Sequence, residues 1–120
     1  MLRGCMALAQ NELVWLKGLL RKYYESHSVF PPYDVSRREF GFGNQKKIDS
    51  RHLHFENVNE MNAYLRNSVP LYFSGSVSEY ALPAAQPMEK KGWLGADLIY
   101  EFDADDLQTD CKQNHDAWKC

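Results

Sequence analysis

The chain has 120 residues, of which 44% are hydrophobic and 13% aromatic, so it can form one folded domain and is not a disordered chain. Its formal net charge of −2 excludes a generally basic surface, and any contact with nucleic acid must depend on local patches. No stretch is long and apolar enough to predict a membrane span, and we expect no membrane association.

The N-terminal residues 1–20 resemble a secretory signal only faintly. Arg3 precedes a short apolar run, but Gln10, Glu12 and Lys17 interrupt that run, which is not typical of a signal peptide. We therefore expect an intracellular, reducing location, either cytoplasmic or, in a eukaryote, nuclear. The three cysteines, an odd number, fit metal ligands or buried thiols better than a disulfide framework.

Residues 11–26 are predicted to form a helix with an apolar stripe, and Asn11 can cap its start. The stripe follows spacings of three and four residues through Leu13, Leu16, Leu20 and Tyr24, and is widened by Trp15, Leu19 and Tyr23. Because the aromatic pair at 23 and 24 continues this stripe, we interpret it as core and not as a platform for stacking bases.

Two strands are predicted next, over residues 37–43 and 48–55, with a hairpin connection at 43–47. Alternation along the second strand places Arg51 with the apolar Leu53 and Phe55, and the histidines at 52 and 54 on the opposite face. An arginine on an apolar face needs a charged partner, either a protein group or a phosphate. The histidine pair could bind a metal or could form an ordinary hydrogen-bonded strand face.

A helix over residues 57–67, capped by Asn57 or Asn59, and a strand over residues 71–80 follow. A loop rich in proline and alanine then occupies residues 81–91. The order of helix, two strands, helix, strand, loop and strand indicates a single α/β or α+β domain with the last strand at its centre.

That last strand begins at Asp97 and runs into a series of acidic residues ending at Asp106. Its apolar residues favour a largely buried strand, and alternation places Asp97, Glu101 and Asp103 on one face. The backbones of the second and third acids are then roughly 6–7 Å apart. Two carboxylates held in this way repel each other unless a cation binds both, and magnesium is commonly bound by two carboxylates plus substrate phosphates. The alternative is an edge strand followed by a solvated acidic loop.

Cysteine and histidine follow at the end of the chain as Cys111, His115 and Cys120. Such short spacings allow the three side chains to bind one zinc ion, although a structural zinc site needs four ligands. A cysteine two or three residues beyond Cys120 would complete the site, so we expect the chain to be truncated within a zinc motif spanning residues 107–120. The alternative is two free thiols and a surface histidine.

Three blocks in this order resemble the catalytic (small) subunit of archaeal and eukaryotic DNA primases, on the archaeal side. The blocks are Arg38–Phe42, Arg51–Phe55, and Pro87–Asp106 followed by the cysteine and histidine group. The resemblance extends from about Leu16 to the last residue. It implies an α+β primase fold with a mixed sheet, flanking helices and a zinc knuckle, of which residues 1–120 form the N-terminal part of the catalytic domain.

The resemblance also implies roles for individual residues. Glu101 and Asp103 match the pair that holds the catalytic magnesium or manganese ions, although the family usually has aspartate at the first position. A rival register would use Asp103 and Asp105. The remaining matches are Glu39, Arg51 and Asp97 for nucleotide contact, and Cys111, His115 and Cys120 for structural zinc.

The implied activity is template-directed synthesis of short RNA primers from ribonucleoside triphosphates on single-stranded DNA, with the primase large subunit as partner. A further carboxylate and a Ser-x-His motif that the family carries later in sequence cannot be identified in this chain, so we expect no primer synthesis by the chain alone. Two other classes stay open. They are a metal-dependent nuclease and a non-catalytic zinc-containing module that binds nucleic acid or protein.

Overall fold

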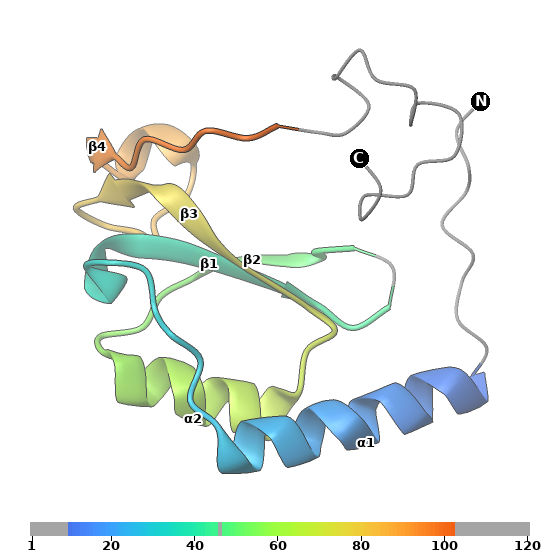
Figure 1. The fold of residues 1–120 in the computed structure, drawn as a ribbon. Helices are drawn as coiled ribbons and strands as arrows, with labels where there is room; N and C mark the ends of the chain where they lie inside the picture. The colour runs from blue at the N-terminus through green and yellow to red at the C-terminus, as the bar shows by residue number, and fades with distance from the viewer. Residues whose placement is uncertain (1–9, 46, 103–120) are drawn as a thin grey trace, which may run out of the picture.

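A computed structural model describes residues 10–45 and 47–102 of the chain (Figure 1). The elements in chain order are α1 (Gln10–Ser26), a 3₁₀ turn (Val35–Arg37), β1 (Arg38–Gly43), β2 (Ser50–Leu53), α2 (Val58–Ser68), β3 (Tyr72–Tyr80), a second 3₁₀ turn (Met88–Lys90) and β4 (Trp93–Ala96). This order confirms the predicted succession of helices and strands up to the last strand.

Helix α1 presents its predicted stripe toward the rest of the molecule. The residues at spacings of three and four are half-buried, namely Leu13, Leu16, Leu20 and Tyr24. The predicted widening of the stripe is wrong, because Trp15, Leu19 and Tyr23 are exposed. Burial, followed by the neighbouring hydroxyl of Tyr23, raises the pKa of Tyr24 above its ordinary value.

Helix α2 begins where its cap was predicted. The side-chain oxygen of Asn57 accepts a hydrogen bond from the backbone N–H of Glu60 at 2.9 Å, and the Glu60 carboxylate accepts one from the N–H of Glu56 at 2.7 Å. Both bonds satisfy donors at the helix start that have no partner within the helix. Met61 and Leu65 are the buried apolar side chains of this helix.

The sheet has the strand order β2-β1-β3-β4, and its three pairings are all antiparallel. The expectation of a mixed sheet is therefore wrong for the described residues. Strands β2 and β3 both pair with β1, one on each side, so they run parallel to each other without touching. Helix α2 connects them and lies with α1 on one face of the sheet (Figure 1).

The core forms where the sheet meets the helices. Phe40 from β1 is 1% exposed, and its ring lies 5.1 Å from that of Phe55 and 5.5 Å from that of Phe73. Val35 and Met61 belong to the same cluster, with Val29, Leu53 and Tyr64 packed against it, and Leu65 and Val69 are buried as well. Since β1 alternates, the side chain of Glu39 points to the sheet face opposite this core.

The acidic segment departs from its prediction as a buried central strand. Strand β4 ends at Ala96 and lies at an edge of the described sheet, and residues 97–102 form no strand. The apolar side chains of this segment are exposed, with Leu98 at 79%, Tyr100 at 77% and Phe102 at 80%. The pairing of β4 with β3 reaches Ala96, and the backbone N–H of Asp97 donates to the carbonyl of Val77 at 2.9 Å.

Candidate active site

Glu39 is a nearly buried carboxylate, 5% exposed, on the sheet face away from the helices. The ammonium group of Lys91, which is fully buried, lies 3.5 Å from its Oε2 atom. The same ammonium group donates to the carbonyl of Pro83 and lies 5.7 Å from the centre of the Tyr80 ring. A buried lysine needs such partners, because an isolated charge is costly to remove from water.

A bulge in β2 brings two further side chains to Glu39. The pairing of β1 with β2 shifts between Phe40 and Phe42, and His52 has a positive φ of 63°. Arg51 Nε and His52 Nδ1 consequently lie 3.6 Å and 3.3 Å from the same Glu39 oxygen. The prediction that these two residues face opposite sides is wrong, because a bulge interrupts the alternation of a strand. The predicted charged partner of Arg51 is present and is Glu39.

A polar pocket of about 250 Å³ lies beside this cluster. It is lined by Glu39, Phe40, Gly41, Arg51, Ser74, Gly75, Ser76, Tyr80 and Met88. Arg51 is well exposed, whereas Lys91 is buried. Two cationic side chains against one carboxylate leave a positive charge at the pocket, and the arginine offers a planar donor to a phosphate or carboxylate.

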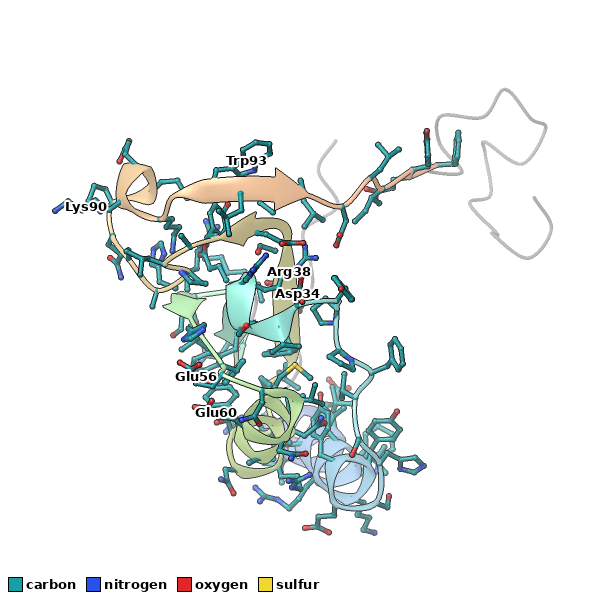
Figure 2. The ribbon with its side chains drawn as sticks, turned by 90° about the vertical axis from the view of Figure 1, so that its left-hand side faces the viewer. Asp34, Arg38, Glu56, Glu60, Lys90 and Trp93 are labelled. Carbon is teal, nitrogen blue, oxygen red and sulfur yellow. The ribbon has the colours of Figure 1, made fainter. Side chains whose placement is uncertain are left out.

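A second charged cluster forms around Arg38, whose side chain is fully buried at the start of β1. Its guanidinium contacts both carboxylate oxygens of Asp97, at 2.9 Å and 3.0 Å, and Glu79 at 3.2 Å. It also donates to the carbonyls of Ser76 and Val77, which lie where the register of β3 shifts. Figure 2 shows Arg38 on β1 beneath β4, whose first residue is labelled above it.

The structure separates the predicted site residues into these two clusters. Glu39 and Arg51 are in contact, and Asp97 belongs to the Arg38 cluster with its side chain about half exposed. Glu101 is exposed in the segment after β4. Asp103, Asp105, Cys111, His115 and Cys120, as well as the whole predicted zinc motif, lie outside the described residues.

The two histidines of β2 do not act as a pair. His52 contacts Glu39, whereas His54 bonds through Nε2 to the carbonyl of Ser36 at 2.8 Å and lies near Glu56. Across residues 10–45 and 47–102, no group of three or more potential metal ligands is placed to hold an ion. Nor does any helix in that part of the chain reach the length and apolarity that crossing a membrane requires.

Sequence reasoning missed the roles of Arg38 and Lys91. Both carry charges that usually lie at the surface. The burial of Arg38 depends on partners such as Val77 and Asp97, which are 39 and 59 residues away in sequence. The burial of Lys91 depends on Glu39 and on the carbonyl of Pro83 in the preceding loop. The signal that could have indicated Arg38 is its position beside Glu39 and Phe40, since alternation would otherwise place a charge on the core side of the strand.

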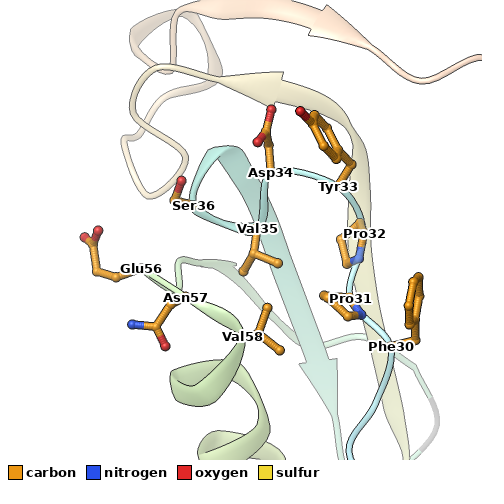
Figure 3. Close-up of a pocket in the computed structure, with 10 residues that line it drawn as sticks. All are labelled: Phe30, Pro31, Pro32, Tyr33, Asp34, Val35, Ser36, Glu56, Asn57 and Val58. Atoms are coloured by element: carbon orange, nitrogen blue, oxygen red, sulfur yellow. The ribbon is translucent and has the colours of Figure 1, made fainter.

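A larger pocket of about 490 Å³ lies elsewhere, between the connection 30–36 and the start of α2 (Figure 3). Its side chains include exposed Phe30 and Tyr33, while Val35 and Val58 face each other across it. It contains none of the predicted site residues and lacks the cationic groups of the Glu39 cluster. We therefore place the candidate active site at the smaller, charged pocket.

Several known proteins are similar to this chain in sequence. No protein-family model matches the chain. The DNA primase small subunit PriS of Sulfolobus acidocaldarius is 39% identical over 92 residues, which cover 74% of this chain and 28% of the relative. PriS of Sulfurisphaera tokodaii is 38% identical over 102 residues (82% and 30%), and PriS of Pyrobaculum arsenaticum is 38% identical over 93 residues (77% and 30%).

An antiparallel sheet covered by helices on one face, with buried charges on the other, defines an α+β domain with a polar site on its open face. The matched residues of this chain belong to the family of archaeal DNA primase small subunits, which confirms the resemblance. The chain spans about a third of the length of the curated relatives that it matches.

Proposed function

We propose that the chain is part of a DNA primase catalytic subunit that synthesises short RNA primers from ribonucleoside triphosphates on single-stranded DNA. The observation that carries this proposal is the identity of 37–39% to several proteins named DNA primase small subunit over most of the chain. The charged cluster at Glu39 joins the three blocks on which the resemblance depends, because Arg51 comes from the second block and Lys91 from the third.

In this proposal, Glu101 and Asp103 hold magnesium or manganese, because carboxylate oxygens are the ligands that these hard cations prefer. Exposed Glu101 is free of the sheet and accessible to an ion and a substrate. When bound, the metal ions supply charge neutralisation for the attacking and leaving oxygens of an in-line phosphoryl displacement. Cys111, His115 and Cys120 are proposed as ligands of a structural zinc ion on the strength of their spacing alone.

The side chains of the chain itself would bind and orient the nucleotide. Arg51 is the cationic group of the pocket that is accessible to a triphosphate, and Glu39 fixes its guanidinium at 3.6 Å. The buried ammonium of Lys91 adds positive charge behind the pocket without direct contact. Positioning and electrostatic stabilisation provide most of the rate enhancement in phosphoryl transfer, so such pre-oriented charges suit the reaction.

The partners proposed for the complete protein are the primase large subunit, a single-stranded DNA template and ribonucleoside triphosphates. The chain alone is proposed to be inactive, because the family's later carboxylate and Ser-x-His motif have no counterpart here. Template-dependent dinucleotide synthesis by the purified chain would contradict this part of the proposal.

A chimera tests the proposed function directly. The residues of the Sulfolobus acidocaldarius relative that align with this chain are replaced by those of this chain, and template-directed primer synthesis is measured. We expect synthesis that Asp103→Asn abolishes and Glu101→Asp retains, whereas exposed Glu89→Gln, a control outside the acidic segment, has no effect. A chimera that folds and binds template but makes no primer would contradict the proposal.

The two alternative classes give different results in the same assay. A metal-dependent nuclease would degrade DNA with magnesium in the absence of nucleoside triphosphates. A zinc-containing binding module would keep its affinity for nucleic acid or protein after Glu101→Ala and Asp103→Ala, and would lose it when zinc is removed.

A further inference from the structure

Asp97 attaches the chain to the sheet shortly before the acidic pair Glu101 and Asp103. Its backbone N–H donates to the carbonyl of Val77 at 2.9 Å, and its carboxylate meets the fully buried guanidinium of Arg38 through two contacts of 2.9 Å and 3.0 Å. Beyond it, residues 98–102 form no helix or strand and are exposed. The direction in which this segment leaves the sheet is therefore set at Asp97.

Arg38 is itself held from several sides, so it can serve as a rigid support. Its Nε donates to the carbonyl of Tyr33 at 3.0 Å, and Nη1 donates to the carbonyl of Val77 at 2.7 Å. A planar guanidinium with its donors occupied has one orientation, and a carboxylate bound in fork geometry takes its orientation from it. Arg38 thus joins β1, the irregular part of β3 and the end of β4 in one network.

We propose that Arg38 and Asp97 form a positioning pair that fixes the path of the segment after β4 and thereby places Glu101. Asp97 then acts through Arg38 and does not contact the nucleotide. Glu101 lies four residues beyond Asp97, a span of at most about 13 Å in extended chain, so the anchor restricts where its carboxylate can reach. The inference rests on the proposed function for the role of the acidic pair, but the anchoring itself does not.

Residue-resolved amide hydrogen exchange on the 120-residue chain tests the anchoring. Asp97→Asn keeps the shape of the side chain and removes its charge, and we expect exchange at residues 93–97 to accelerate about tenfold as the charge-assisted bonds are lost. Glu79→Gln is the matched control, since it removes a carboxylate from the same arginine without touching the acidic segment. The amides of α2 report whether a variant has unfolded. Unchanged exchange at residues 93–97 in Asp97→Asn would overturn the proposal.

Binding of Mn²⁺, followed by electron paramagnetic resonance, tests the consequence for the acidic pair. Residues that orient metal ligands typically change affinity by 10–100-fold, and we expect Asp97→Asn to weaken binding by about tenfold while Glu79→Gln leaves it unchanged. Arg38→Lys should weaken it similarly, and the Arg38→Lys/Asp97→Asn double variant should be no worse than the worse single variant, because both changes break one connection. Additive losses would show that Asp97 acts independently of Arg38 and would overturn the proposal.

These two measurements separate the inference from the proposed function. If the unsubstituted chain binds no Mn²⁺, the proposed metal site fails, and the exchange experiment still decides whether Arg38 and Asp97 anchor the segment. If Arg38→Lys unfolds the chain, as α2 would report, the decision rests on Asp97→Asn against Glu79→Gln.

Discussion

At the scale of single residues, the charges of the candidate site converge on Glu39. Three side chains lie within 3.3–3.6 Å of its carboxylate, and one of them, Lys91, is fully buried. A buried charge that loses its partner is far more costly than the pair itself is favourable. Glu39 therefore stabilises the fold as well as orienting Arg51 at the pocket.

Glu39→Gln should lower the free energy of unfolding by about 3 kcal/mol or more, because the ammonium of Lys91 would remain buried without a counter-charge. Urea denaturation followed by circular dichroism measures this change. Glu56→Gln is the control, since this exposed carboxylate lies 3.7 Å from His54 and should contribute less than about 1 kcal/mol. Equal stabilities of the two variants would contradict the account of Lys91.

At the scale of elements, the sequence predicted those parts whose signals are local. The Asn57 cap, the stripe of Leu13, Leu16 and Leu20, and the hairpin after Phe42 follow from spacing and side-chain chemistry. The bulge in β2 could not be predicted in this way, because the shift that brings Arg51 and His52 together depends on pairing between strands. The exposure of the segment after β4 could not be predicted either, because it depends on which other parts of the molecule pair with this segment or cover it.

Glycines in α1 and β1 should respond in opposite ways to substitution by alanine. A Cβ atom at Gly18 meets nothing within 4 Å, so Gly18→Ala should stabilise the chain by about 0.5–1 kcal/mol through better helix propensity. A Cβ atom at Gly43 would clash with the carbonyl group of Lys47, and Gly43→Ala should destabilise by about 1–3 kcal/mol. Thermal denaturation of both variants checks the contrast, and a stable Gly43→Ala variant would contradict the described approach of β1 to its hairpin.

Tyr64 on α2 makes stability depend on alkaline pH. Burial against Phe42 and Phe55 raises the pKa of its hydroxyl, so the folded state favours the neutral phenol. The contribution of this hydroxyl to stability is fully present below the pKa of the unfolded state, near 10. It is lost as the pH rises through the higher pKa of the folded state. The free energy of unfolding, measured by denaturation, should fall less steeply with increasing pH in Tyr64→Phe than in Tyr33→Phe. Tyr33→Phe is the control because its ring is exposed. Identical pH dependence of stability in the two variants would show that Tyr64 is not its source.

At the scale of the whole molecule, two of the exposed apolar surfaces among the described residues are relevant to contacts with other structure. One is α1, where Trp15 is 66% exposed, and the other is the segment after β4, with Leu98 and Phe102 at about 80%. Exposed apolar patches of this kind mark surfaces that bind other protein or dye. The matched relatives are about three times as long as this chain, so they contain further structure that could cover such surfaces.

The isolated chain should therefore bind the dye ANS in its folded state. Replacing Leu98, Tyr100 and Phe102 by serine should reduce the fluorescence enhancement without lowering the melting temperature, because these side chains contact little of the fold. Replacing the buried Met61 by serine is the contrasting change and should unfold the chain. Dye binding that is insensitive to the triple substitution would show that the segment is not exposed in solution.

We propose above that the acidic segment following Asp97 binds the catalytic metal through Glu101 and Asp103. Electron paramagnetic resonance of Mn²⁺ titrated into the chain tests it most directly, with Glu101→Gln, Asp103→Asn and Asp105→Asn measured in parallel. We expect the first two substitutions each to remove the bound Mn²⁺ and Asp105→Asn to leave it bound. Binding that survives Glu101→Gln but is lost with Asp105→Asn would instead select the rival register, and binding that survives all three would contradict the claim.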